Sequence, residues 1–386
     1  MTDTAARHAR HRLLLIGLTL FGVIGIPGLY LLGVIDIETV NTLGRYLTYA
    51  MVAIGLDLIW GYAGILSLCQ ALFFAIGAYA MGMYMAHQYT SLDNPSIPQT
   101  LYVVYPFEIG ESTADAVLPW FWVPFKSFPV ALVLAIVIPA AVAALIGFFG
   151  FISRVRGVYF AILTQALAVA ACLFFGDNNM CLCGTNGMSQ FKTFLGVDLG
   201  SENFKLTMYL VSLFATIGVY LLCRFIVQSR FGRILVAIRD SESTLRFAGY
   251  KPHQYKLFVF TLSAAIAGLA GALYVPQMQI ITPSDMGAIK SILIVVWVAV
   301  GGRGTLSGAI LGALVVNLLY KNLTSPIDLF GLQVWKPDYW LILLGTTFVC
   351  VVMFFPNGLV SVFGKIRRRK KTADIEASTK PVGAAS

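Results

Sequence analysis

Long apolar runs recur along the whole chain and constrain its fold more than any other feature. Ten can be traced, at roughly 13–35, 43–60, 62–86, 128–152, 158–175, 207–228, 257–280, 288–301, 305–320 and 339–360. A helix needs about 20 apolar residues to cross a bilayer, and most runs approach that length. Hydrophobic residues make up 58% of the chain and charged residues 12%, a balance that no soluble domain of this size accommodates. The sequence predicts an all-α, polytopic membrane protein with about ten transmembrane helices.

Positive charge is distributed unevenly over the segments between the apolar runs. With the N-terminus in the cytoplasm, 20 of the 27 Lys and Arg residues fall on the cytoplasmic side and 7 on the outside. This split follows the positive-inside rule, so the net charge reflects topology and not nucleic-acid binding. We expect both termini to be cytoplasmic, with a basic N-terminus over 1–12, a transmembrane domain over 13–364, and a basic, disordered tail over 365–386 against the lipid surface.

Two long segments are predicted on the outside, at residues 87–127 and 176–206. A connection of this length usually has a function; contact with an external partner is one interpretation, and a simple cover over the helices is the other. The second loop contains Cys181-Leu-Cys183. A zinc site needs further ligands nearby, and the four histidines lie elsewhere in the chain, so we expect no metal here.

A basic segment, residues 229–256, separates two apolar runs on the predicted cytoplasmic side. It carries six basic and two acidic residues, a net charge of +4. Its apolar residues fall at helical spacing: Phe231, Ile234, Leu235 and Ile238. Asp240 or Ser241 can cap a second short helix that ends at Gly249, before Pro252. The sequence predicts two short helices with an apolar and basic face for a partner; the alternative is a loop that only sets topology.

A short pattern, G-x-x-G-x-L-S, occurs at Gly61–Ser67 and again 240 residues later at Gly301–Ser307. Each copy follows an apolar run with a tryptophan near its end, Trp60 or Trp297, and precedes a helix rich in small residues. Glycine permits a sharp turn or the close approach of a neighbouring helix. The repetition is consistent with duplicated halves, and chance recurrence in Gly-rich helices is the alternative.

Few ionisable residues fall within the apolar runs, and Asp57 is the clearest. A carboxylate is costly inside a membrane, so Asp57 is a functional candidate; a structural pair with Arg45 or a helix-end amide is the alternative. The neutral amide side chains on the runs suit a small uncharged solute, or they hold helices together. The runs contain no cluster of Arg or Lys residues, so the sequence does not indicate an anionic cargo. The predicted solute pathway comprises Asp57, Gly61, Gly64, Ser67, Gln70, Gln165, Gly301, Gly304 and Asn317.

Motifs that would give the chain its own chemistry or energy source are missing from the sequence. Gly364-Lys365 lacks the rest of a nucleotide-binding phosphate loop, and neither an H-E-x-x-H motif nor a nucleophile–base set is present. We therefore expect no enzyme activity and no bound cofactor. A transporter of this kind needs an energy source on another chain.

Six segments carry a resemblance to a known family. They are GLDLIWGYAGILSLCQALFFAIGAYAMGMYMA (55–86), RGVYFAILTQALA (156–168), GTNGM (184–188), SRFGRILVAIRDSESTLRFAGYKPHQYKLFVFTLSAAIAGLAGALYVPQ (229–277), WVAVGGRGTLSGAILGALVVN (297–317) and FFPNGL (354–359). The chain resembles the permease subunits of bacterial ABC importers for branched-chain amino acids and urea. Within that group it looks most similar to the second urea permease.

The resemblance implies a heteromeric importer in the bacterial inner membrane. Its other members would be a homologous second permease, two cytoplasmic ATPase subunits that hydrolyse ATP, and an extracytoplasmic solute-binding protein. The implied ATPase-coupling residues are Arg230, Phe231, Gly232, Ile234, Ile238, Arg239, Asp240, Glu242, Gly249 and Tyr250. The implied residues of the outer loop are Thr185, Asn186 and Gly187.

These observations lead to an expected function with two alternatives. We expect a permease subunit for urea or short-chain amides, and branched-chain amino acids are the alternative cargo. An ion-coupled secondary transporter is a further alternative, for which only Asp57 offers an internal coupling site.

Overall fold

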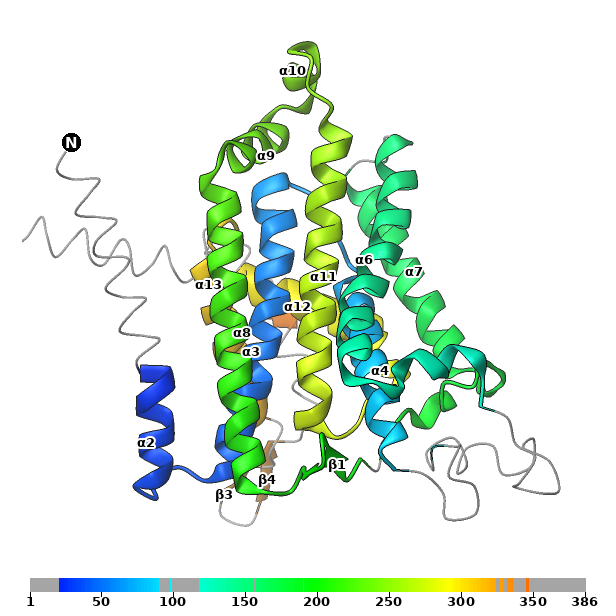
Figure 1. The fold of residues 1–386 in the computed structure, drawn as a ribbon. Coiled ribbons are helices and arrows are strands. Elements are labelled where there is room, and N and C mark those ends of the chain that lie inside the picture. The colour runs from blue at the N-terminus through cyan, green and yellow to red at the C-terminus, as the bar shows by residue number, and fades with distance from the viewer. Residues whose placement is uncertain are drawn as a thin grey trace, which may run out of the picture.

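The computed structural model describes residues 21–89, 98, 118–153, 155, 157–189, 191–323, 327–329, 332–335 and 345–346. Within this part of the chain, most of the long helices run side by side between two ends of the molecule (Figure 1). The predicted N-terminal segment, most of the loop 87–127, most of the apolar run 339–360 and the basic tail lie outside the described residues.

Four helices of the described part are long and apolar enough to cross a membrane: α6 (Phe128–Ile152), α7 (Val158–Gly176), α8 (Glu202–Gln228) and α11 (Pro252–Met278). The pair α12 (Ala288–Gly301) and α13 (Leu306–Leu323) is bent by 118° and adds a fifth span if it is counted as one. These helices support a helical polytopic membrane protein. The total of about ten spans stays a prediction.

The centre of the molecule is formed by α3 (Ile37–Asp57), α4 (Gln70–His87) and α11. Helix α11 packs against α3, α4 and α6, and α3 packs against α8. Small residues allow the close approach, because a Cβ atom on Gly77 of α4 would collide with the backbone of Gly268 on α11. Most of α3 and α4 is therefore buried within the chain itself.

One predicted helix is shorter than its apolar run. The run 62–86 was expected to be one span, but α4 begins only at Gln70, after the π-helical turn η2 (Leu58–Tyr62) and a non-helical segment over 64–69. Gly64 starts this segment with φ of +74°, a left-handed conformation that ends a helix. The composition of the segment is apolar, so the break does not show in hydropathy.

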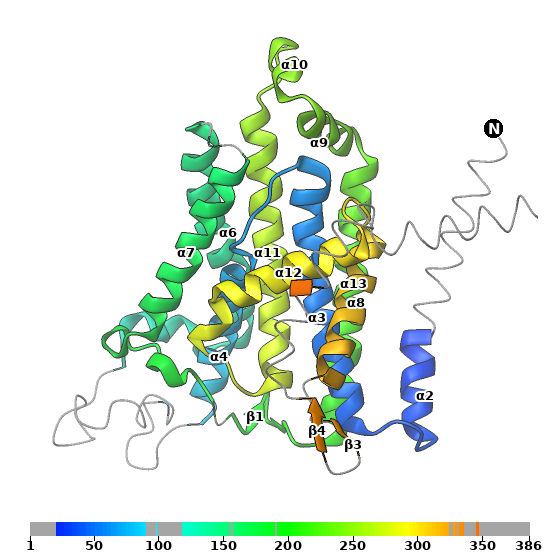
Figure 2. The same cartoon turned by 180° about the vertical axis from the view of Figure 1, so that it is seen from behind.

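The two ends of the molecule differ (Figures 1 and 2). One end carries α9 (Arg230–Asp240) and α10 (Glu242–Phe247). The opposite end carries two short antiparallel hairpins: β1 (Thr193–Phe194) with β2 (Val197–Asp198), and β3 (Ile327–Leu329) with β4 (Leu332–Trp335). The basic segment 229–256, predicted to be cytoplasmic, and the segment 176–206, predicted to be external, thus lie at opposite ends. Which end faces the cytoplasm stays a prediction.

The remaining elements are short. The chain is described from the π-helical turn η1 (Phe21–Gly25), which continues into α2 (Ile26–Leu31). The 3-10 turns are η4 (Trp120–Lys126), η5 (Asn178–Met180), η6 (Gly184–Asn186) and η7 (Pro283–Met286).

Candidate functional site

The two copies of the G-x-x-G-x-L-S pattern lie against each other. A Cβ atom built on Gly61 would lie 2.6 Å from the amide nitrogen and 2.7 Å from the Cα of Gly304, so neither backbone leaves room for a side chain at Gly61. Gly304 itself has φ of +77°. We call the contact of residues 57–64 with residues 301–304 the turn junction.

Asp57 joins the two turns directly. Its Oδ1 accepts a hydrogen bond of 2.7 Å from the amide of Gly304, and its side chain is fully buried. Its Oδ2 has no hydrogen-bond partner. Arg45 lies twelve residues earlier on α3, which is about 18 Å along the helix axis. Of the two structural partners considered for Asp57, the structure contains the backbone amide and not Arg45.

A second link across the turn junction comes from Arg303. Its Nε donates a hydrogen bond of 3.1 Å to the carbonyl oxygen of Trp60. Its guanidinium also lies 5.0 Å from the centroid of the Trp60 ring, a cation–π distance. Both turns are therefore held by side chains as well as by close backbone contact.

Arg239, near the end of α9, binds the same junction from the end of the molecule that is predicted to be cytoplasmic. Its Nη1 donates a hydrogen bond of 2.8 Å to the carbonyl oxygen of Gly61, and its Nε pairs with Asp240 at 3.1 Å. A Cβ atom on Gly64 would lie 2.8 Å from Cγ of Arg239. The segment predicted to couple to an ATPase is thus attached to the turns predicted to line the pathway.

The basic segment forms the two short helices that its sequence predicts. The hydroxyl of Ser229 caps α9 by accepting hydrogen bonds from the amides of Phe231 and Gly232, at 3.1 and 3.4 Å. Ser241 lies at the N-cap position of α10. Gly249 has φ of +85°, and Pro252 takes the first position of α11, where its missing N–H is not needed.

The apolar face of α9 packs against this chain, which differs from the expected face for a partner. Leu235 and Ile238 are buried, and the ring of Phe231 lies 5.3 Å from that of Tyr255 on α11. Ile234 is partly buried. The exposed apolar surface of the segment lies on and after α10.

Helix α10 presents Phe247, whose surface is 93% exposed, and Tyr250, which follows the helix, is 44% exposed. The helix is braced by Glu242, which pairs with Arg246 at 2.7 Å and with Lys256 of α11 at 2.8 Å. Arg230 and Arg233 are not in ion pairs with described residues, so the positive charge of α9 is available to a partner.

A cavity of about 370 Å³ lies among α3, α4, α11, α12 and α13. Its aromatic lining residues are Tyr46, Tyr49, Phe74, Tyr274, Trp297 and Tyr320. Its charged lining residues are Arg45, Asp285, Lys290 and Lys321. Its three basic residues come from α3, α12 and α13 and lie far apart in the chain. They stand at the ends of the apolar runs, so the expectation that the runs contain no cluster of Arg or Lys stays a prediction.

The other residues of the predicted pathway occupy several places. Asn317 lines the cavity, and its Nδ2 donates a hydrogen bond of 2.7 Å to the carbonyl oxygen of Ala313. Ser67 lies in the non-helical segment with its Oγ 3.2 Å from Sγ of Cys69. Gln70 and Gln165 each have side-chain nitrogen and oxygen atoms that are buried without partners. Gly301 packs so closely on Gly308 that the turn between α12 and α13 excludes any side chain there.

The GTNGM segment, predicted to be external, is hydrogen-bonded to the connection between α11 and α12. Met188 and Ile281 exchange two backbone hydrogen bonds, of 2.8 and 2.9 Å, and Gly187, with φ of +67°, packs on Ile281. Thr185 and Asn186 are exposed on η6. Cys181 and Cys183 are not joined by a disulfide, and the described residues contain no group of three metal-ligating side chains.

Comparison with known proteins agrees with this architecture. The profile of a family described as the branched-chain amino acid transport system permease component matches residues 38–352. The LivM high-affinity branched-chain amino acid permease of Escherichia coli (strain K12) is 25% identical over 350 residues, which are 85% of this chain and 70% of the relative.

Two relatives from Methanocaldococcus jannaschii extend the match. A probable LivM permease is 24% identical over 81% of this chain and 90% of the relative. A probable LivH permease is 28% identical over 64% of this chain and 76% of the relative. No solved structure matches significantly. The relatives do not single out the urea branch that the sequence resemblance suggested. The chain belongs to the family of branched-chain amino acid transport system permeases, and so is a multi-pass membrane component of a bacterial-type ABC transporter, not an enzyme.

Proposed function

We propose that this chain is one of two homologous permease subunits of an ATP-driven importer in the bacterial inner membrane. Its sequence has no nucleotide-binding motif, so the energy would come from two ATPase subunits on the cytoplasmic side. A solute-binding protein would deliver the cargo from outside. The family match and the relatedness to both a LivM and a LivH permease support this assembly.

The turn junction suggests how the subunit responds to an ATPase. A partner that moves α10 would also move α9, because the two helices are consecutive. It would move the start of α11 as well, because Glu242 of α10 pairs with Lys256 of α11. Arg239 would carry that movement to Gly61, and the Asp57–Gly304 bond would carry it to α12 and α13. Both of these helices line the cavity.

Branched-chain amino acids are the cargo that we propose. The single observation that carries this choice is the family match over most of the chain, and the aromatic and aliphatic lining of the cavity suits an aliphatic side chain. Urea is a second candidate, favoured by the unpartnered amide groups of Gln70 and Gln165, which could bind an uncharged amide.

The test is ATP-dependent uptake by proteoliposomes that contain this chain, the second permease, the ATPases and the binding protein. We expect uptake of radiolabelled leucine. Uptake of urea without leucine would reverse the choice of cargo. Uptake that is unaffected by omission of this chain would overturn the proposed role itself.

A further inference from the structure

We propose that Arg45 binds the carboxylate of the cargo, so that the cavity of this permease is itself a recognition site for aliphatic α-amino acids. This inference rests on the proposed function and deepens it. It assigns to the permease a selectivity that an external binding protein could otherwise supply alone.

The contacts of Arg45 leave its charge available. Nη2 donates a hydrogen bond of 2.9 Å to the hydroxyl of Thr42, and Nη1 lies 2.9 Å from the thioether sulfur of Met278. Its Nε is buried and has no hydrogen-bond partner. None of these contacts is to a carboxylate.

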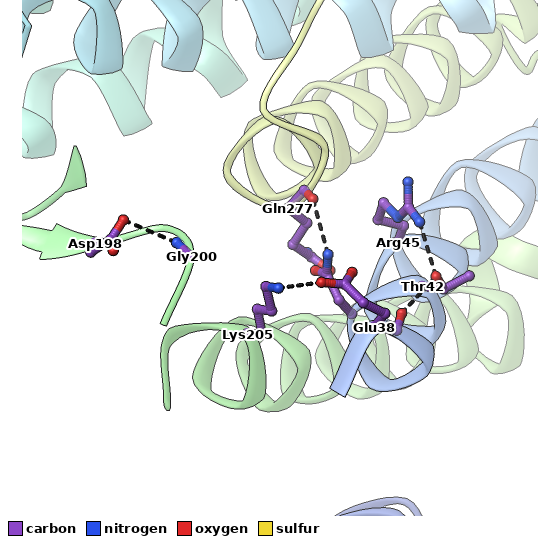
Figure 3. A network of polar contacts seen from close by, with 8 residues as sticks. Glu38, Thr42, Arg45, Asp198, Gly200, Lys205 and Gln277 are labelled. Carbon is purple, nitrogen blue, oxygen red and sulfur yellow. Dashed lines mark hydrogen bonds and ion pairs between the residues drawn. The ribbon is translucent and has the colours of Figure 1, made fainter. Parts of the chain in front are cut away.

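The nearest carboxylate on the same helix is engaged elsewhere. Glu38 pairs with Lys205 of α8, and Figure 3 shows its side chain directed toward α8 while the guanidinium of Arg45 projects away from it. Asp285, the acidic residue of the cavity lining, pairs with Lys290. Among the described residues, Arg45 is therefore a cation of the cavity that forms no direct ion pair, and Glu38 acts on it only over a longer distance.

An arginine within the membrane part of a protein is costly unless an anion or water accompanies it, and such residues usually have a function. A guanidinium prefers a carboxylate, which it can bind with two parallel hydrogen bonds. The free Nε and the Nη atoms of Arg45 provide such donors at the wall of the cavity. A cargo with a carboxylate would supply the missing anion, and urea would not.

The rest of the cavity suits the other end of an aliphatic amino acid. Tyr49 lies 5.1 Å from the ring of Trp297 and 5.4 Å from that of Tyr274, centroid to centroid, and these rings form a continuous aromatic wall. Trp297 is only 5% exposed, and its Nε1 has no partner. The volume of about 370 Å³ lies within the range of roughly 300–1,000 Å³ that is usual for small-molecule sites.

The experiment compares leucine with leucinamide, which keeps the side chain and lacks the carboxylate. Equilibrium binding of each radiolabelled compound is measured with the purified permease–ATPase complex, without the binding protein, and uptake is measured in proteoliposomes. The wild-type complex should bind leucine at least about tenfold more tightly than leucinamide. Arg45→Gln should abolish that preference, and Arg45→Lys should keep part of it, because a lysine retains the charge and loses the planar fork.

Arg224→Gln is the matched control, since it removes one positive charge near the C-terminal end of α8, outside the cavity. It should keep the preference for leucine. If Arg45→Gln fails to assemble, the proposal is tested by comparing the preference of Arg45→Lys for leucine over leucinamide with that of the wild type. An unchanged leucine preference in the Arg45 variants overturns the carboxylate site.

Two further outcomes separate this inference from others. If the wild-type complex takes up leucine while the Arg45 variants keep its selectivity, the carboxylate site is wrong and the proposed function stands. Uptake of urea without leucine would contradict both the carboxylate site and the proposed cargo.

Vesicles of phosphatidylcholine alone are compared with vesicles that contain phosphatidylglycerol. An Arg45→Gln effect that occurs only with the anionic lipid would identify a lipid phosphate as the occupant and overturn the proposal.

Discussion

The carboxylate of Asp57 and the amide of Gly304 are joined by a 2.7 Å hydrogen bond, although 247 residues of sequence separate them. The bond connects the end of α3 to the turn between α12 and α13. Arg239 reaches the same place by its hydrogen bond to Gly61. The basic segment, a central helix and a bent helix pair therefore meet at one point, and changes at this point should affect both transport and stability.

The first prediction concerns the charge of Asp57. Asp57→Asn keeps an oxygen that can accept from Gly304, but a neutral acceptor forms a bond roughly half as strong as an ionised one. Asp57→Ala leaves the Gly304 amide unpaired and should destabilise the protein by about 1–3 kcal/mol. We expect Asp57→Asn to accumulate normally with reduced uptake, and Asp57→Ala to lose thermal stability as well. Normal uptake by Asp57→Asn would exclude a functional role for the charge.

The second prediction concerns the space between the two turns. Gly61→Ala places a methyl group against Asp57 and within 2.6 Å of the Gly304 nitrogen, so the junction must open. Gly218→Ala on α8 is the matched control, because a Cβ atom there meets nothing within 4 Å. The melting temperature and the rate of uptake should both be lower for Gly61→Ala than for the wild type. Gly218→Ala should be neutral or stabilising by up to about 1 kcal/mol.

Local signals made the basic segment predictable from the sequence. Its helix spacing and the left-handed Gly249 depend on residues within one or two turns, and the structure contains both. Ser241 takes the N-cap position of α10, but its side chain makes no capping hydrogen bond. The apolar runs likewise located the long helices. The orientation of α9 was not predictable, because an apolar face can pack equally well against a partner or against the same chain.

The features that the sequence did not reveal depend on contacts between distant segments. The contact of Arg239 with Gly64, just before the late start of α4 at Gln70, joins residues that are 175 positions apart in the chain. The cavity gathers Arg45 and Lys290 from α3 and α12, which no window along the sequence includes. The repeated glycine pattern marked both turns in advance, but only the fold places them in contact.

The third prediction separates packing from docking in the basic segment. Ile238 is only 4% exposed, so Ile238→Asp would bury a carboxylate without a partner and should lower the amount of folded protein in the membrane. Phe247 is 93% exposed, so Phe247→Ala should leave the folded protein intact. If α10 docks into an ATPase, Phe247→Ala should nevertheless reduce ATPase co-purification. Full co-purification and full uptake in Phe247→Ala would mean that the exposed ring is not a contact.

The fourth prediction tests the turn that follows α10. Gly249 has φ of +85°, and a Cβ atom there would meet no neighbour within 4 Å, so backbone conformation alone limits substitution. Gly249→Val introduces a β-branched residue, which disfavours left-handed backbone by more than the roughly 1–2 kcal/mol of an ordinary residue. Gly249→Asn is the matched control, since asparagine tolerates this conformation. We expect the Val variant to reach the membrane normally, because the turn lies outside the packed core. It should lose solute-stimulated ATP hydrolysis, because α10 is displaced relative to α11.

The Asn variant should keep that activity. Equal activity of the two variants would show that the position of α10 does not matter, and the basic segment would then serve only to set topology.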